Sequence, residues 1–315
     1  MKTIEEATDI RHRVLVAFEA AERQHYAAQI RRLLTFVIIG GGPTGVEMAG
    51  AVAEMARHTL RGEFRRIDPS EARIFLIEGS DRVLNAFPEK LSVRARAQLE
   101  QLGVVVRLKT LVTDVRAVGV TIRCGDQTEE IPAATLVWAA GVRASPLGKV
   151  LADAAGIETD RQGRVPVGDD LSIAGHPEVF VIGDLALSRP SPDAAPLPGL
   201  APVAMQQGHY VAKLIRRRLG GGSLTAFRYR DRGTMATIGR ARAVAVIGPL
   251  KFSGLLAWLI WLFIHLMYIV EFQNRLLIFF QWAWNYLTWN RSARLITGDK
   301  EKSAGERVKD SLNRP

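Results

Sequence analysis

A short glycine cluster is the first part of the sequence with a chemical signature. Gly40, Gly42 and Gly45 fit the pattern G-x-G-x-x-G, which here follows the apolar run 35–39 and precedes a helix-like segment. In that context the first glycine allows a tight turn, the second lets backbone approach a pyrophosphate, and the third lets the helix pack closely on the strand. N–H groups at the helix start attract phosphate. The cluster therefore predicts a dinucleotide site.

Glu78 is the second candidate in this region, because it ends the next apolar segment, FLIEG. A carboxylate at the end of that strand can accept hydrogen bonds from both hydroxyls of an adenosine ribose. The same carboxylate would repel a 2′-phosphate, so the sequence favours NADH over NADPH. Arg82, four residues later, weakens this preference.

Glu47 lies two residues past the last glycine. A carboxylate in the first turn of a helix is often only a complement to the helix dipole. From residue type alone, the structural and the functional interpretation of Glu47 both stay open.

A second candidate ligand-binding segment is VFVIGDLA, residues 179–186. A strand that ends in Gly183-Asp184 would place the carboxylate at the carboxyl edge of a sheet, where polar ligands bind. Taken alone, such a Gly-Asp pair is also typical of an ordinary turn. The apolar segment that ends at Ala140 and Gly141, together with the upstream nucleotide turn, favours the binding interpretation.

The surrounding elements alternate between strand-like and helix-like patterns. Helices are expected over 3–33, 46–66, 89–102 and 203–219, and strands over 36–40, 73–79, 104–108, 111–118, 120–124 and 135–141. Thr3 and Glu6 have the spacing of a capping box. This alternation predicts an α/β fold with a parallel sheet, and segments 235–239 and 243–248 predict a short β-ribbon.

Composition limits the classes of function. The chain has 315 residues, a net charge of +10 and one cysteine, Cys124, which excludes an intrachain disulfide, a CxxC redox pair and a thiolate-built metal site. No metal is expected. The positive charge suits anionic partners, but the arginines follow no nucleic-acid-binding pattern, so we expect no nucleic-acid partner.

The C-terminal region differs sharply from the rest. Residues 254–270 are apolar except for His265, and the following residues 271–291 mix aromatic with charged side chains. Seventeen apolar residues are slightly short of the roughly 20 that usually cross a bilayer. A monotopic interfacial anchor is favoured, while a single span and a buried core helix remain alternatives.

The order GGGPTGVE, FLIEG, VWAAGV, VFVIGDLA and APVAMQQG, followed by the aromatic tail, resembles the two-dinucleotide-binding-domain flavoproteins. Within that family the chain is similar to type II NADH dehydrogenases, the non-proton-pumping NADH:quinone oxidoreductases. The resemblance implies a Rossmann-like NAD(H) domain inserted in a partial FAD domain, with a C-terminal β-ribbon and membrane-associated helices. The implied boundaries are 1–34 (FAD-domain helix or linker), 35–145 (NAD(H) domain), 146–232 (FAD domain), 233–297 (membrane anchor) and 298–315 (disordered tail).

The resemblance also implies roles for particular residues. Glu47 would lie close to the nicotinamide and the isoalloxazine, where it could orient the amide or relay protons to quinone, and it becomes the candidate catalytic residue. The candidate cofactor-binding residues, for NADH and FAD together, are Gly40, Gly42, Gly45, Glu78, Ala140, Gly141, Gly183, Asp184, Ala201, Pro202 and Val203.

Two departures from the family pattern weaken parts of this assignment. Pro202 stands where many members carry a glutamine that lines the quinone pocket, and Gln206 and Gln207 are weaker substitutes. The glycine turn that binds FAD in the family precedes the NAD turn, and this sequence contains no such earlier turn. We therefore expect an N-terminally truncated chain that binds FAD weakly or not at all.

The expected activity is hydride transfer from NADH to FAD and electron transfer to membrane quinone. The alternatives are an inactive, membrane-attached NAD-binding remnant that serves as an interaction subunit, and a related flavoprotein reductase with another acceptor. Expected partners are NADH, quinone, an anionic bilayer surface and a second copy of the chain as a homodimer. The expected location is the cytoplasmic face of the inner membrane, reached through the C-terminal helices.

Overall fold

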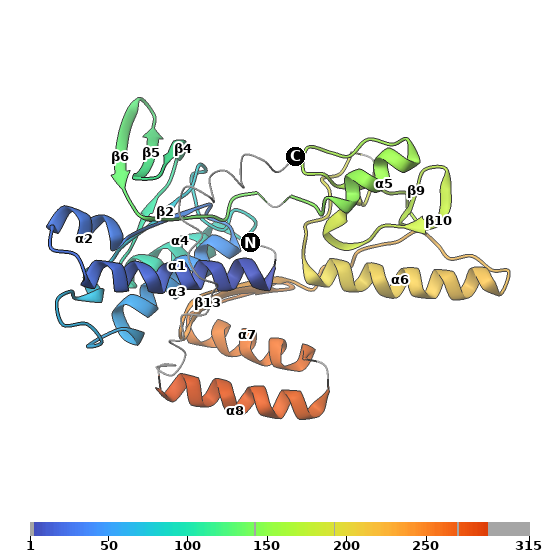
Figure 1. The fold of residues 1–315 in the computed structure, drawn as a ribbon. Coiled ribbons are helices and arrows are strands. Elements are labelled where there is room, and N and C mark those ends of the chain that lie inside the picture. Colours follow the sequence, from blue (N-terminus) through green and yellow to red (C-terminus); the bar gives the residue numbers. More distant parts are fainter. Residues whose placement is uncertain (1–2, 142, 192, 270, 289–315) are drawn as a thin grey trace. The chain divides into compact units, whose positions relative to one another are not determined.

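The chain folds into two units. The structure, a computed structural model, describes residues 3–141, 143–191, 193–269 and 271–288 (Figure 1). Unit 1 contains the residues up to Ala140 and those from Met235 onward, and unit 2 contains Gly141–Thr234. The chain therefore leaves unit 1 after Ala140 and returns to it at Met235, so residues distant in sequence share unit 1.

A four-stranded parallel sheet forms the centre of unit 1. Its strands are β1 (Thr35–Ile39), β2 (Arg73–Ile77), β3 (Val104–Arg107) and β7 (Thr135–Trp138), in the order β3-β2-β1-β7. All five residues of β1 are buried. A strand covered on both faces needs a continuous apolar run rather than an alternating one, and Phe36–Ile39 provide it. The parallel sheet predicted from the alternation of strands and helices is confirmed.

Helices cover one face of this sheet. They are α1 (Ile4–Glu22), α3 (Pro43–Glu54) and α4 (Glu89–Gln101), and they pack against every second strand residue in one core. Core members from the sheet are Phe36, Ile38, Ile74, Leu76, Val104 and Val106, and from the helices Val14, Phe18, Val46, Val52, Leu91 and Leu99.

A small antiparallel sheet covers the opposite face. It consists of β4 (Thr110–Arg116), β5 (Gly119–Cys124) and β6 (Gln127–Pro132), drawn in green in Figure 1. Its buried side chains, Val120, Ile122 and Ile131, pack on the alternate residues of the central strands. The expected hairpin over 111–124 is confirmed, and β6 is a third strand that the sequence pattern did not indicate.

Two expected helices have different bounds in the structure. The helix expected over 3–33 is two helices, because α1 ends at Glu22 and α2 (Ala27–Leu33) starts after a short break. At that break the carboxylate of Glu22 accepts the backbone N–H groups of Arg65, Arg66 and Ile67 at 3.0–3.2 Å. The helix expected over 46–66 begins earlier, at Pro43, and ends in a π-helical turn, Met55–Thr59. The cap predicted at Thr3 is confirmed by its bond from the Glu6 N–H at 3.2 Å.

Unit 2 is built from short elements around a small core. They are α5 (Leu147–Ala155), β8 (Val165–Pro166), β9 (Ser172–Ile173), β10 (His176–Phe180), the 3-10 turn Gly183–Leu185, β11 (Ala186–Leu187) and α6 (Ala201–Leu219). The strand expected over 179–182 is wrong in its bounds, because β10 ends at Phe180 and pairs antiparallel with β9. Val181 instead donates its N–H to the Leu171 carbonyl.

The C-terminal part of unit 1 is a sheet followed by a helical hairpin. The predicted ribbon is a three-stranded sheet of β12 (Thr234–Gly239), β13 (Arg242–Ile247) and β14 (Leu250–Ser253). The hairpin consists of α7 (Leu255–Tyr268) and α8 (Phe272–Thr288), joined by aromatic contacts such as Trp261 on Trp282, with ring centroids 5.9 Å apart. Within 3–141, 143–191, 193–269 and 271–288, no helix is long and apolar enough to cross a bilayer. The tail expected to be disordered, 298–315, lies outside the described residues.

A glycine allows this C-terminal sheet to rest directly on α3. A Cβ added to Gly50 would lie 1.7 Å from the carbonyl oxygen of Ile238 on β12. Any other residue at position 50 would push the strand away from the helix. Gly50 therefore sets the distance between the C-terminal sheet and α3.

We expect Gly50→Ala to lower the free energy of unfolding by about 1–3 kcal/mol, because overpacking at a rigid backbone contact forces the two elements apart. In a helix with room for a methyl group, the same change usually stabilises by roughly 0.5–1 kcal/mol. Urea unfolding monitored by fluorescence measures the difference. Gly220→Ala is the control, because its nearest neighbours are 3.5 Å or more away. A Gly50→Ala protein as stable as the wild type would contradict the contact.

Candidate functional site

The glycine turn joins β1 to α3 and has the geometry expected of a nucleotide turn. Gly40 has a φ of +110°, and a Cβ there would lie 2.7 Å from the backbone nitrogen of Ala140. A Cβ on Gly45 would lie 1.8 Å from the carbonyl oxygen of Gly40. Positions 40 and 45 therefore require glycine, the first for its backbone conformation and both for close packing.

Gly42 differs from these two, because the space beside it is open. It is the N-cap of α3, no side chain caps this helix, and a Cβ on Gly42 would meet nothing within 4 Å. The N–H groups of the first turn therefore have no side-chain acceptor, and the open space lies next to them. This arrangement fits a pyrophosphate, which takes up such N–H groups and the positive end of the helix dipole.

Glu78 follows β2 and lies against the turn. Its carboxylate accepts the N–H of Gly41 at 2.5 Å and the N–H of Ser80 at 2.7 Å. Burial raises the pKa of the Glu78 carboxyl, but hydrogen bonds from Ser80, Gly41 and Gly79 outweigh this effect, and the pKa lies below its ordinary value. Glu78 is therefore ionised at neutral pH, as an acceptor of ribose hydroxyls must be.

Ala140 and Gly141 follow β7 at the same edge of the sheet. The Ala140 carbonyl accepts the indole N–H of Trp138 at 2.7 Å, and Gly141 has a φ of +68°. Because the carboxyl ends of parallel strands meet at one sheet edge, Ala140 lies beside Gly40. The structure thus brings Gly40, Glu78 and Ala140 together within unit 1.

Glu47 lies on α3 beyond its first turn, since the helix begins at Pro43 and its first turn contains no acidic residue. The placement in the first turn expected from the sequence is therefore wrong, and the helix dipole, which falls off within one turn, does not explain this residue. Its carboxylate accepts the N–H and the hydroxyl of Thr237, both at 3.3 Å. Burial raises the pKa of Glu47, against smaller opposing effects of Thr237 and His265.

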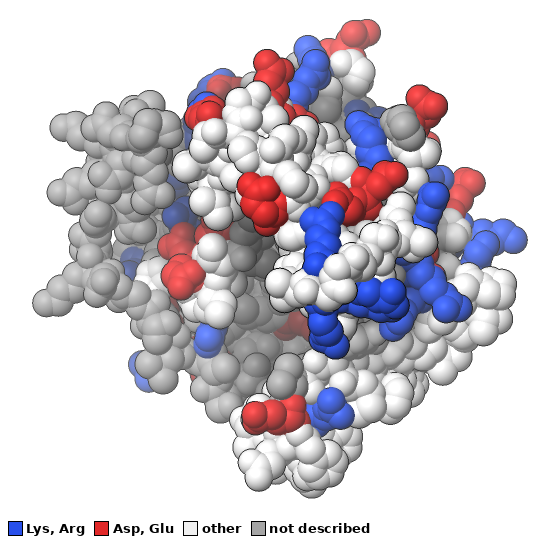
Figure 2. Space-filling model, turned by 90° about the vertical axis from the view of Figure 1, so that its right-hand side faces the viewer, with Lys and Arg blue, Asp and Glu red and all other residues white. Residues whose placement is uncertain are grey.

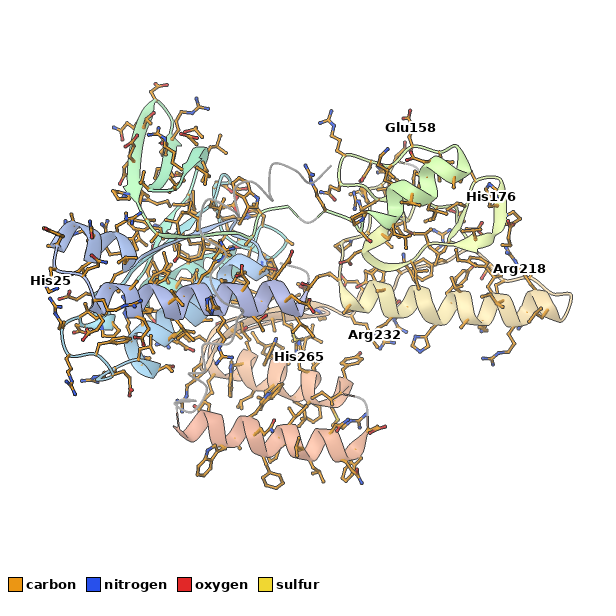
Figure 3. All side chains as sticks on the ribbon, in the orientation of Figure 1. His25, Glu158, His176, Arg218, Arg232 and His265 are labelled. Atoms are coloured by element: carbon orange, nitrogen blue, oxygen red, sulfur yellow. The ribbon has the colours of Figure 1, made fainter. Side chains whose placement is uncertain are left out.

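Glu47 lines a cavity of about 500 Å³ in unit 1. One wall is α3 and the end of β12, and the other is the hairpin of α7 and α8. The hairpin contributes Trp258, Trp261, Leu262, Trp282 and Tyr286. In Figure 3, His265 lies on α7, the helix that forms this wall. Sequence reasoning did not single out these aromatic residues as site residues.

Glu54 is a second carboxylate in the same cavity that the sequence analysis missed. It accepts the N–H of Arg240 at 2.5 Å. Its spacing of seven residues from Glu47, two helical turns, is the signal that could have found it.

Gly183 and Asp184 lie in a 3-10 turn of unit 2, between β10 and β11. Gly183 has a φ of +67°, and its N–H is donated to the side-chain oxygen of Gln207 at 2.7 Å. The Asp184 carboxylate is exposed and faces Gly199, where a Cβ would be 3.0 Å from its oxygen. Asp184 therefore remains available to a polar ligand, whereas the Gln207 amide is engaged within the fold.

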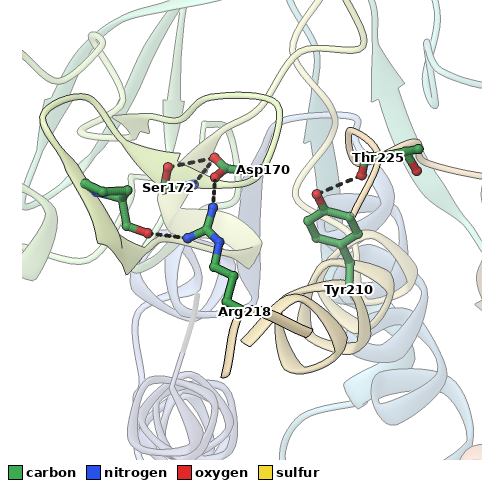
Figure 4. Close-up of polar contacts among 6 residues, drawn as sticks. Asp170, Ser172, Tyr210, Arg218 and Thr225 are labelled. Carbon is green, nitrogen blue, oxygen red and sulfur yellow. Dashed lines mark hydrogen bonds and ion pairs between the residues drawn. The ribbon is translucent and has the colours of Figure 1, made fainter. Parts of the chain in front are cut away.

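Helix α6 begins at Ala201, and no side chain caps its N-terminus. Val203 is buried and Pro202 lies at the helix start, while Gln206 exchanges two hydrogen bonds with the backbone of Arg230 at 2.9 and 3.0 Å. The far end of the helix is fixed by Arg218, which binds Asp170 and the Pro177 carbonyl (Figure 4). The N–H groups at the start of α6 are therefore presented by a helix anchored at its other end.

Known proteins share both the sequence pattern and the fold. The profile of the pyridine nucleotide-disulphide oxidoreductase family matches residues 3–208, and that of the NDH2 C-terminal domain matches residues 232–289. The chain is 45% identical over 312 residues to the type II NADH:quinone oxidoreductase Ndh of Mycobacterium tuberculosis, covering 98% of this chain and 66% of that protein. It is 44% identical to NdhA of the same organism, with coverages of 94% and 63%.

The chain thus spans just under two thirds of the length of these relatives. Among solved structures, NDH2 from Plasmodium falciparum in complex with NADH has a similar fold, with a TM-score of 0.82 at 17% identity. That likeness covers 94% of this chain and 74% of the other, and at such low identity it bears on the fold alone.

The raised pKa of Glu47 predicts how stability depends on pH. Between the ordinary value of 4.5 and the raised pKa, the folded protein holds a proton that the unfolded chain has lost, so the free energy of unfolding falls as pH rises through this window. Glu47→Gln removes this dependence. The free energy of unfolding of the variant minus that of the wild type should be larger at pH 7 than at pH 4. Urea unfolding at both pH values measures this difference. If Glu158→Gln, on the exposed surface of unit 2, produces the same gain, burial of Glu47 is not the cause.

Proposed function

Because the chain belongs to the pyridine nucleotide-disulphide oxidoreductase family, and within it to the type II NADH dehydrogenases, we propose that it passes hydride from NADH to FAD and electrons on to a membrane quinone. The observation that carries this proposal is the uncapped glycine turn of unit 1 with the ionised Glu78 beside it. The family match to the C-terminal region supports the quinone as acceptor.

In this proposal NADH binds along the carboxyl edge of the parallel sheet. The pyrophosphate lies beside Gly42 at the start of α3. The adenosine ribose hydroxyls donate hydrogen bonds to the Glu78 carboxylate, either replacing the N–H groups of Gly41 and Ser80 or binding beside them. Gly40 and Gly45 serve by keeping the turn and the helix close to the sheet. An ionised carboxylate at Glu78 disfavours a 2′-phosphate and so selects NADH.

Unit 2 supplies groups that fit one side of FAD. The exposed Asp184 is suited to the hydroxyls of the ribityl chain, and the uncapped start of α6, at Ala201 and Val203, is suited to negative charge at the pyrimidine edge of the flavin. Pro202 offers no N–H and only shapes this helix start. FAD, when bound, supplies the chemistry that accepts a hydride and releases electrons to quinone.

Glu47 is the proposed proton donor on the quinone side. A carboxyl group whose pKa is raised by burial holds its proton closer to neutral pH and can give it to a developing oxyanion. Pro202, Gln206 and Gln207 remain weaker candidates for quinone contact. Both glutamines already bond backbone groups of their own unit, Gln206 at Arg230 and Gln207 at Gly183.

The hairpin of α7 and α8 is the proposed membrane-binding element. In Figure 2 its surface, at the bottom, is largely free of charged side chains. Large apolar side chains exposed on the two helices are Leu255, Leu256, Leu259, Phe263, Met267, Tyr268, Phe272, Leu276, Leu277, Phe279, Phe280 and Trp284. An apolar surface of this extent in water marks an interaction site, and tryptophan and tyrosine suit the depth of lipid headgroups. We assign it to the cytoplasmic face, where NADH is available.

The activity itself is the direct test of the proposal. Purified protein with added FAD, NADH and a short-chain quinone should oxidise NADH, followed by its absorbance, at a rate that depends on the quinone. Binding of NADH without any turnover would favour a nucleotide-binding subunit over an enzyme.

Glu78→Ala should weaken NADH binding roughly 10- to 100-fold, because hydrogen bonds to a charged group contribute about 1.5–3 kcal/mol. Titration of NADH fluorescence measures the dissociation constant, and NADPH binding should weaken less than NADH binding. Glu71→Ala, an exposed carboxylate before the same strand, is the matched control. Equal losses for both variants would remove Glu78 from the site.

Phe263→Glu combined with Phe280→Glu should reduce membrane binding at least roughly tenfold, since burying one phenylalanine contributes about 1.5–3 kcal/mol. Co-sedimentation with vesicles that contain phosphatidylglycerol measures the partition. The two side chains are 62% and 67% exposed, and the control Val150→Glu replaces an apolar side chain on α5 that is 64% exposed. If Val150→Glu lowers binding as much as the hairpin variant, the hairpin is not the specific contact.

A further inference from the structure

Helix α3 carries two carboxylates on one face. Glu47, Ala51 and Glu54 are spaced by four and three residues, which places them above one another along the helix. All three line the cavity between α3 and the hairpin. Ala51, which lies between the two glutamates on this face, has only a methyl side chain.

Each carboxylate is held by a different backbone group at the end of β12. Glu47 accepts from Thr237, and Glu54 accepts from the N–H of Arg240. The contact of Gly50 with Ile238 lies between these two pairs and keeps α3 close to the strand. The carboxylates are therefore fixed at two points along one cavity wall.

The charged groups around Glu54 leave it able to take up and release a proton. Burial raises the pKa of Glu54, while the N–H of Arg240 and the charges of Arg242 and Arg240 oppose this rise. The guanidinium of Arg240 itself lies 3.8 Å over the ring of Tyr286. At Glu47 the facing titratable group is His265 on α7. Burial outweighs these opposing effects at both carboxyls, so both pKa values lie above the ordinary value of 4.5.

The cavity is large enough for water between the two groups. Its volume of about 500 Å³ far exceeds the roughly 10–15 Å³ that one water requires, and the carboxylates provide polar partners along one wall. The opposite wall, of tryptophans and a tyrosine, is apolar and suits the ring or the tail of a quinone.

We propose that Glu54 is a proton-relay group that acts through Glu47, taking protons from water and passing them along the cavity to Glu47 while quinone is reduced at its far side. The inference rests on the proposed function, whose overall reaction is NADH + Q + H⁺ → NAD⁺ + QH₂. The O–H bond of Glu47 breaks as a quinone oxygen gains its proton. Cavity water then returns a proton from Glu54 to Glu47, and solvent reprotonates Glu54.

The test compares two electron acceptors. Quinone needs protons, whereas ferricyanide accepts electrons without them. In the full chain with NADH and FAD, Glu54→Gln should lower the rate of quinone reduction about tenfold at alkaline pH. This is a modest share of the ~10²–10⁴-fold by which a positioned acid or base accelerates a reaction. Ferricyanide reduction should stay within roughly twofold of the wild type, and Glu54→Asp should restore most of the quinone rate.

The pH profile and a control exclude a merely structural effect. In Glu54→Gln, the alkaline decline of quinone reduction should start at lower pH than in the wild type. The control is Glu100→Gln, an exposed carboxylate on α4 that pairs with Arg96. Equal losses with quinone and ferricyanide would mean that Glu54 supports the fold only and would overturn the relay. A wild type that reduces no quinone would overturn the proposed function instead.

A second measurement needs neither FAD nor turnover. Infrared titration of the C=O stretch of protonated carboxyls, assigned with Glu47→Gln and Glu54→Gln, follows both groups in the full chain. If they share one cavity, removing the charge of Glu54 should lower the titration midpoint of Glu47, because a neighbouring negative charge disfavours ionisation. An unchanged midpoint would show that the two carboxyls do not communicate and would contradict the relay.

Discussion

The position of α3 is the constraint on which the rest of unit 1 depends. Gly45 brings the start of the helix against the carbonyl of Gly40, and Gly50 brings its middle against the carbonyl of Ile238. At both places a Cβ would lie within 2 Å of a backbone oxygen. One helix thus touches the nucleotide turn and the C-terminal sheet with no side chain in between. The N–H groups at its start lie at the proposed phosphate site, and the face that carries Glu47 and Glu54 lines the cavity.

Three carboxylates of unit 1 show how the same side chain takes different roles. Glu78 accepts several hydrogen bonds, which lower its pKa despite burial and keep it an acceptor for hydroxyl groups. Burial raises the pKa of both Glu47 and Glu54, where fewer N–H groups compensate. Such carboxyl groups are suited to donate protons. The number of N–H donors that point at each carboxylate, rather than residue type, separates the proposed binding role of Glu78 from the proposed proton-transfer roles of Glu47 and Glu54.

The C-terminal region connects the exposed apolar surface of the hairpin, the proposed membrane contact, to this helix. The sheet of β12 to β14 packs on α3, and the hairpin of α7 and α8 follows it in the chain. Aromatic side chains inside the hairpin line the cavity, whereas its large apolar side chains on the outside are exposed. If the hairpin is the membrane contact proposed above, a hydrophobic quinone reaches the two carboxylates along apolar protein surface.

Local sequence was sufficient for the features that depend on neighbours in the chain. The apolar run of β1, the glycines of the turn, the position of Glu78 after β2 and the cap at Thr3 were all predicted and are present. Helix bounds were predicted less well. The break after Glu22 depends on hydrogen bonds to Arg65, Arg66 and Ile67, which lie more than forty residues away.

Tertiary structure alone decided the surroundings of Glu47 and the importance of Glu54. The bonds that hold them join residues 190 and 186 positions apart, because the chain passes through the whole of unit 2 before it returns at Met235. A helical period places Glu47 and Glu54 on one face, but it does not say what lies opposite that face. The sequence by itself determined a dinucleotide turn with an acidic partner, whereas burial by β12, α7 and α8 decided the protonation behaviour of the two glutamates.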